Sequence, residues 1–254
     1  MTTLWVREAA DRFWANAGGV PAQYPRDLRR AVAWALPLAV VDLPRLGVGA
    51  VDAWLRRHHV VGVHLATHDR PLRACLLAYG GAGVVLLDGA DADEERRFSL
   101  AHEVAHFLVE YALPRERTAH RVGLDALAVL DGHRAPTVDE RVDAVLSGAS
   151  LQAVLHLMER TPHGHPPLGA ISQAERRADD LALELLAPAE AVTAILREGE
   201  ATTAREAAAL VASTFGLPAP VARMYTDRLW PGSDESPDGS LAERLGLGRS
   251  PSCS

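Results

Sequence analysis

A short polar motif inside an apolar segment constrains the fold of this chain more than any other feature. The motif is His-Glu-Val-Ala-His, residues 102 to 106. The side chains around it are mostly apolar: Phe98, Leu100, Ala101, Val104, Ala105, Phe107 and Leu108. A glutamate and two histidines in such surroundings cost free energy unless they are paired or bound. We therefore expect a helix from Ser99 to Tyr111, with Ser99 as its N-cap.

The spacing of the two histidines predicts a zinc site. Positions i and i+4 of a helix stand on one face, one turn apart, so His102 and His106 can reach the same zinc ion with bonds of about 2.0–2.1 Å. Glu103 follows the first ligand and is placed to take a proton from the attacking water. In a chain with 11 histidines this pattern arises by chance in roughly one case in thirty. An amphipathic helix with a polar face is the alternative.

A catalytic zinc ion takes three protein ligands and keeps one position open, so a third ligand must come from elsewhere. Besides the acidic residues, the candidates are His120, His133, His156, His163 and His165. Glu175 stands out because it lies in the first turn of a helix predicted from Ser172 to Leu186. Asp179 lies one turn further along the same face, where it can accept the free N–H of a ligating histidine. Two alternatives stay open: Ser172 and Glu175 also fit a helix capping box, and Asp179 also fits an exposed acid.

Other polar residues have less definite roles. Hydrolysis needs a group that stabilises the oxyanion, and the sequence favours none of the candidates Tyr111, His120 and Tyr225. The acidic run of Asp91, Asp93, Glu94 and Glu95 can bind a cation, but we favour a simpler interpretation. In that interpretation the run places negative charge before the N-terminus of the zinc helix.

Two stretches of the sequence resemble the ImmA/IrrE family of bacterial metallo-endopeptidases. RRFSLAHEVAHFLVE (Arg96 to Glu110) is similar to the family's R-F-T-L-A-H-E-L-G-H-F, and ERRADDLALELLAP (Glu175 to Pro188) is similar to E-x-x-A-N-x-F-A-A-x-L-L-M-P. The resemblance implies that His102, His106 and Glu175 bind zinc and that Glu103 is the general base. It also implies a gluzincin-like endopeptidase that cleaves a helix-turn-helix repressor and so releases transcription of stress-response or mobile-element genes.

The chain departs from the family pattern at several positions. Asp179 replaces the usual asparagine, which strengthens the expectation that it orients a ligand. Ala105, Leu181 and Ala187 replace the usual Gly, Phe and Met. Between His106 and Glu175 there are 68 residues (175 − 106 − 1), more than expected for the family. The excess, within 123–167, is interpreted as a lid or substrate-selecting insertion.

The pattern of apolar runs predicts an α+β fold. Short runs at 38–43, 60–66, 72–79 and 83–87 predict a small, partly antiparallel sheet, with a hairpin at Gly80, Gly81 and Gly83. This sheet is expected to pack on the zinc helix, before a mostly helical C-terminal half in which Leu151 to Arg160 is also predicted to be helical. The predicted organisation is a helical segment (1–44), a peptidase domain (45–200) with an insertion at about 112–170, a helix-turn-helix-like end (201–230) and a disordered tail (231–254).

Charge and composition limit the partners that we expect. The net charge of −7 and pI of about 5.9 lack the basic footprint of a nucleic-acid-binding chain. Two cysteines and no apparent signal or membrane span lead us to expect a soluble, cytoplasmic protein. The final two helices, which meet at Gly216, carry only Arg205, Arg223 and Arg228 as basic residues, so packing is favoured over DNA contact. The alternative functions are a DNA- or partner-binding regulator with a structural or latent zinc site, and a zinc hydrolase acting on another substrate.

Overall fold

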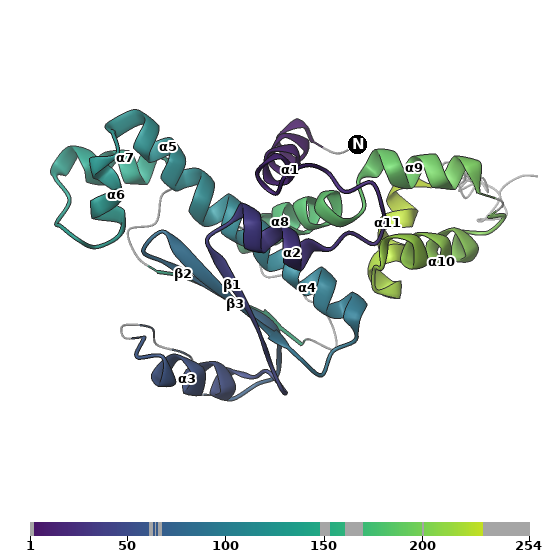
Figure 1. Ribbon diagram of the computed structural model, residues 1–254, viewed down its shortest axis with the longest axis horizontal. Helices are drawn as coiled ribbons and strands as arrows, with labels where there is room; N and C mark the ends of the chain where they lie inside the picture. Colours follow the sequence, from purple (N-terminus) through teal and green to yellow (C-terminus); the bar gives the residue numbers. More distant parts are fainter. Residues whose placement is uncertain are drawn as a thin grey trace, which may run out of the picture.

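The computed structural model describes residues 3–60, 63, 65, 68–147, 153–160, 170–199 and 201–230. The predicted α+β architecture is confirmed: a small mixed sheet has α3 on one face and a thick layer of helices on the other (Figure 1). The predicted disordered tail at 231–254 and the loop that contains His163 and His165 lie outside the described residues.

Within the described residues, the sheet is built from a β-hairpin and two flanking strands. The strands are β1 (Leu38–Leu43), β2 (Leu72–Tyr79), β3 (Ala82–Asp88) and β4 (Val154–Glu159). Their order is β1-β3-β2-β4, with β1 parallel to β3 and the other two pairs antiparallel. The predicted hairpin is confirmed, and Gly80 and Gly81 turn it with φ angles of 61° and 81°, which residues without a Cβ adopt readily. Of the predicted strand at 60–66, the described residues Val60, Val63 and Leu65 are not in a strand.

Strand β4 shows that the helix predicted from Leu151 to Arg160 is wrong. Alternate side chains of β4 face opposite sides of the sheet. Val154 and Met158 pack against one core, and Leu155 and Leu157 pack against the other. This period of two is that of a strand. A short apolar run fits a helix as well as a strand, and the pairing with β2 makes this segment a strand.

The helices form three groups along the chain. Before the hairpin lie α1 (Leu4–Asn16), α2 (Leu28–Ala35) and α3 (Val48–Arg57). After it, one long helical path comprises α4 (Asp93–His106), a π-helical turn η1 (Phe107–Ala112) and α5 (Leu113–Val122), followed by α6 (Asp125–Leu130) and α7 (Val138–Ser147). The C-terminal group is α8 (Ala170–Leu186), α9 (Ala189–Glu198), α10 (Ala204–Phe215) and α11 (Ala219–Leu229).

Helix α4 begins earlier than its predicted N-cap. It starts at Asp93, so Asp93, Glu94 and Glu95 occupy its first turn. Carboxylates are favoured there because they face the positive end of the helix dipole. Ser99 is buried inside the helix and is not its N-cap.

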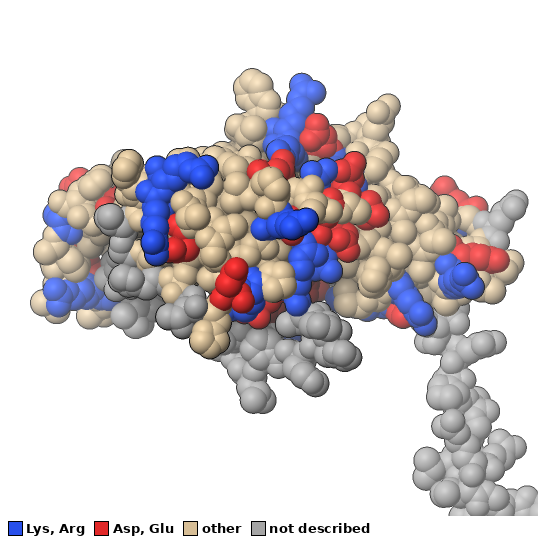
Figure 2. All heavy atoms as spheres, turned by 90° about the horizontal axis from the view of Figure 1, so that it is seen from below, with Lys and Arg blue, Asp and Glu red and all other residues tan. Residues whose placement is uncertain are grey.

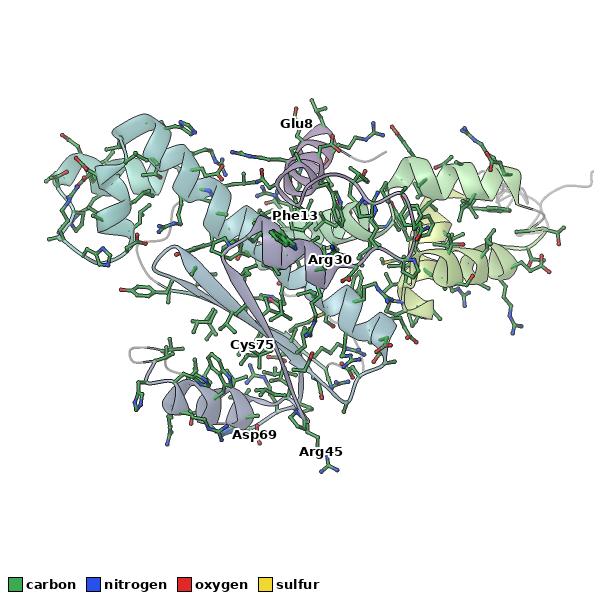
Figure 3. All side chains as sticks on the ribbon, viewed as in Figure 1. Glu8, Phe13, Arg30, Arg45, Asp69 and Cys75 are labelled. Atoms are coloured by element: carbon green, nitrogen blue, oxygen red, sulfur yellow. The ribbon has the colours of Figure 1, made fainter. Side chains whose placement is uncertain are left out.

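Two hydrophobic cores cover the two faces of the sheet. The smaller core lies against α3 and includes Val51, Leu55 and Cys75. The larger core includes Phe13 and Trp14 of α1, each 2% exposed, together with residues of α4 and of all four C-terminal helices. Figure 3 labels Phe13 and Cys75, one from each core. The larger core thus joins residues from the predicted segments 1–44, 45–200 and 201–230.

The last two helices are fastened to the rest of the fold. A capping box of Thr203 and Glu206 starts α10. The left-handed Gly216 ends it, at the turn predicted from the sequence. Arg97 of α4 donates from Nη1 to the carbonyl oxygen of Gly216 at 2.9 Å. The Tyr225 hydroxyl of α11 donates to the carbonyl oxygen of Ala187 at 3.1 Å.

Basic and acidic side chains are interspersed on the face shown in Figure 2. Across the part of the chain that the structure describes, no one helix has both the length and the apolar character needed to cross a membrane. Helices α10 and α11 reach that length and character only when taken together, and they are bent by 118° at the break between them.

Candidate metal centre

Helix α4 places the whole motif in the interior of the protein. His102, Glu103 and His106 are 3%, 0% and 1% exposed. The Nε2 atoms of His102 and His106 lie 3.1 Å apart, as expected for two imidazoles one turn apart on the same face. The predicted helix thus brings both candidate ligands to one point.

Helix α8 packs against α4 and brings Glu175 to the same point. Its Oε2 lies 3.3 Å from Nε2 of His102, and its Oε1 lies 3.6 Å from Nε2 of His106. Because α8 begins at Ala170, Ser172 lies inside the helix and not at its N-cap. The Glu175 carboxylate therefore faces the two histidines and does not close a capping box.

Strand β4 adds a fourth group, His156. Its Nδ1 donates to the carboxylate of Glu103, at 3.1 and 2.9 Å from the two oxygens. Its Nε2 lies 3.1 Å from Oε1 of Glu175, and its ring stacks on that of His106 with 3.8 Å between centroids. The sequence offered His156 only as one of several histidines. The alternation of apolar residues in β4 was the signal that could have placed it opposite the motif.

Together, His102, His106, His156 and Glu175 form a cluster that can hold a metal ion. Each offers one ligand atom, and these atoms all lie within 4.8 Å of one another. Tetrahedral zinc with bonds near 2.0–2.1 Å separates its ligand atoms by about 3.3 Å, close to the shorter distances in the cluster. Imidazole nitrogen and carboxylate oxygen are donors that zinc prefers.

Two carboxylates orient the rings of the motif. Nδ1 of His102 donates to Asp179 Oδ1 at 3.0 Å, the contact predicted from the helical spacing. Nδ1 of His106 donates to Glu110 Oε1 at 3.1 Å. With both Nδ1 atoms used as donors, the two rings in their neutral form would turn their Nε2 lone pairs towards the same point. That arrangement suits a cation, because two lone pairs facing each other repel.

Glu110 was not singled out from the sequence. It lies four residues after His106, in the π-helical turn η1. Such turns inside longer helices are rare and are frequent at functional sites. The i, i+4 spacing from His106 was the available signal, but sequence alone does not show which surface carboxylates turn inward.

The excess of carboxylates favours positive charge on His102 and His156. Burial lowers the pKa of His102, but hydrogen bonds to Asp179 and Glu175 outweigh it and raise this pKa to about 9. Burial also opposes the charge on His156, and Glu103 together with Glu175 raises its pKa to about 10. Hydrogen bonds from His102, His106 and His156 hold the pKa of Glu175 far below its usual range. A bound divalent ion would replace protons in this network.

The other residues considered for the site lie elsewhere. The hydroxyl of Tyr111 accepts a hydrogen bond from the backbone N–H of Gly81 at 2.7 Å, and Tyr225 is bonded to Ala187. His120 lines a cavity of about 610 Å³ against α1 and α5 that includes none of the four clustered residues. Within the acidic run, Asp91 pairs with Arg160, Asp93 with Arg96, and Glu95 with Arg73.

Neither a scan against protein-family models nor a search of curated proteins gives a match for this chain. The resemblance to the ImmA/IrrE family therefore depends on the two motifs quoted above. The inference of function depends on the geometry of the cluster and on the residues beside it.

Proposed function

We propose that the protein is a zinc-dependent endopeptidase in which His102, His106 and Glu175 hold the metal and Glu103 is the general base. The observation that carries this proposal is the position of Glu103. Its side chain is 0% exposed, lies beside the cluster, and is hydrogen-bonded to His156, one of the cluster's four members. A buried carboxylate is costly, and a site that only binds metal does not need it.

The chain's own groups divide the work of hydrolysis. When bound, zinc supplies Lewis-acid polarisation of the scissile carbonyl and of water. Glu103 accepts the proton of the attacking water and passes it to the leaving amine. Asp179 and Glu110 keep the His102 and His106 rings in the tautomer that leaves Nε2 free.

We further propose a helix-turn-helix repressor as the substrate, on the strength of the resemblance in the two motifs. The test is incubation of the protein and zinc with a helix-turn-helix repressor, taken from beside its gene where one is encoded there, with fragments identified by intact mass. The wild type should yield defined fragments. Glu103→Gln should bind zinc normally and yield none.

A matched control keeps this test specific. Glu94 lies in the first turn of the same helix and is exposed, so Glu94→Gln makes the same chemical change outside the site and should cleave like the wild type. Full cleavage by Glu103→Gln would sink the mechanism.

One observation favours a second function. His156 brings the number of protein donors to four, the number found in structural zinc sites. A regulator with a structural zinc ion would bind one zinc per chain, lose its fold when zinc is removed, and leave every peptide substrate intact. Metal analysis, circular dichroism and the cleavage assay together separate this function from peptidase activity.

A further inference from the structure

We propose that strand β4 is a built-in inhibitor of the metal centre, in which His156 takes the fourth metal position and also engages the general base. This inference rests on the proposed function. It makes the described conformation a latent form, which becomes active when β4 withdraws its histidine.

The first step is the presence of a fourth protein donor in the cluster. A catalytic zinc keeps one position for water or substrate. In this structure a fourth protein donor stands with the three proposed ligands, because the ligand atoms of His156 and of the other three residues all lie within 4.8 Å of one another. The ring of His156 also stacks on that of His106, with 3.8 Å between centroids.

The second step is the state of Glu103. Both of its oxygens lie within hydrogen-bond distance of Nδ1 of His156, at 3.1 and 2.9 Å. With Nδ1 as the donor, Nε2 of the same ring, which lies 3.1 Å from Oε1 of Glu175, can give its lone pair to a metal ion that displaces its proton. One tautomer of one side chain therefore fills the metal position and occupies the base that must accept the proton of water.

The third step is the way in which β4 is held at its C-terminal end. Beyond the C-terminal end, Arg160 pairs with Asp88 at 2.8 Å and donates from Nε to the Leu72 carbonyl oxygen at 3.2 Å. Glu159 pairs with Arg70 at 2.6 Å. The strand itself has no fully buried residue, whereas most of β2 is buried. Withdrawal of His156 would therefore require Val154, Leu155 and His156 to give up their pairing with β2, while the contacts of Arg160 keep the following end of the strand attached.

The pairing of β4 with β2 supplies a lock for testing this proposal. Leu157 of β4 lies opposite Cys75 of β2, and directly opposed residues of antiparallel strands have Cα atoms about 4.5–5.5 Å apart, within the range of a disulfide. Leu157→Cys in a Cys253→Ser background should form a disulfide with Cys75 that holds β4 in place. Reduction should release it.

The lock gives opposite expectations for the two states. The oxidised protein should show less repressor cleavage than the reduced protein, and reduction should restore the level of the Cys253→Ser parent. Equal cleavage in the two states, with the disulfide confirmed by mass, would overturn the proposal, because a strand fixed in place would then not limit activity.

Removal of the histidine gives a readout that does not need activity. In the cobalt-substituted protein, His156→Ala should change the visible spectrum, as expected when a nitrogen ligand is lost, and should weaken metal affinity by more than ~10-fold. A small hydroxamate should perturb the cobalt spectrum of the variant at lower concentrations than that of the wild type, in which it must displace His156. Free imidazole should restore the wild-type spectrum by refilling the position.

Matched variants keep these outcomes interpretable. His133 is exposed and outside the cluster, so His133→Ala should behave as the wild type, while His156→Gln tests the same loss with a larger side chain. His156→Ala should cleave faster than the wild type. Slower cleavage, or an unchanged cobalt spectrum, would overturn the proposal. If no variant cleaves any substrate but the cobalt and hydroxamate results hold, the closure of the site stands and the peptidase function fails.

Discussion

The two carboxylates that orient the histidines offer a quantitative test of the metal centre. Asp179→Asn and Glu110→Gln each remove the charge that accepts an Nδ1–H, at 3.0 and 3.1 Å in the structure. Loss of such partners typically weakens metal binding about 10- to 100-fold. The Asp179 and Glu110 side chains are 37% and 32% exposed, so water can take over part of their role and solvent screens their charge.

We therefore expect the lower end of this range. Each variant should bind zinc about 10-fold more weakly, equivalent to about 1.4 kcal/mol. The two carboxylates contact different rings, so the double variant should lose about 100-fold if their effects add. Competition with a chromophoric chelator at a fixed pH measures these affinities directly.

The control for this series lies on the same helix. Asp180 is next to Asp179 but pairs with Arg228 at 3.0 Å, so Asp180→Asn should leave zinc affinity unchanged. Wild-type affinity in both single variants and in the double variant would refute the claim that Asp179 and Glu110 hold the ligands in their binding tautomer.

Three further predictions concern the ligands and the core. Glu175→Ala should lose most bound zinc by metal analysis, and normal stoichiometry would place the third ligand elsewhere. In the metal-free protein, the pKa values of His102 and His156 are raised to about 9 and 10. Protonation of these two histidines stabilises the fold, and this stabilisation is complete below the unfolded pKa of about 6.5. It is lost as pH rises through the folded pKa values, so melting temperatures measured in chelator should fall from pH 7 to pH 10. A flat profile would contradict this prediction. Gly83→Ala should destabilise the fold by about 1–3 kcal/mol in urea unfolding, because its Cβ would lie 2.7 Å from Leu38 and 2.9 Å from the Leu77 carbonyl oxygen; unchanged stability would show that the sheet relaxes freely.

The fold was predictable where local patterns have a single interpretation. The α+β class, the hairpin at Gly80 and Gly81, and the helix that carries His102 and His106 all follow from spacing and turn chemistry. The start of α4 was misplaced because Ser99 has the chemistry of an N-cap, whereas the acidic residues before it are even better suited to a first turn. Local chemistry is compatible with a helix start at either Ser99 or Asp93.

The candidate site was predictable only in part, because its members come from three elements. Glu175 and Asp179 could be proposed since they share one helix face and one motif. His156 was not selected, because its place beside Glu103 depends on β4 pairing with the edge of β2, and that long-range pairing leaves little trace in a six-residue apolar run. The contact of Glu110 with His106 could not be predicted, because it depends on the direction in which a helical carboxylate turns.

The distance along the chain between the clustered residues has a consequence for how the protein is made. Synthesis proceeds from the N-terminus, and completed parts begin to fold before the rest emerges. The two histidines of α4 are synthesised long before Glu175, and α8 also contributes Leu181, Ala182 and Leu185 to the larger core with 0% exposure. Assembly of the four-residue cluster is thus tied to the docking of α8 into that core, so a nascent chain cannot carry a complete cluster before this helix has been made.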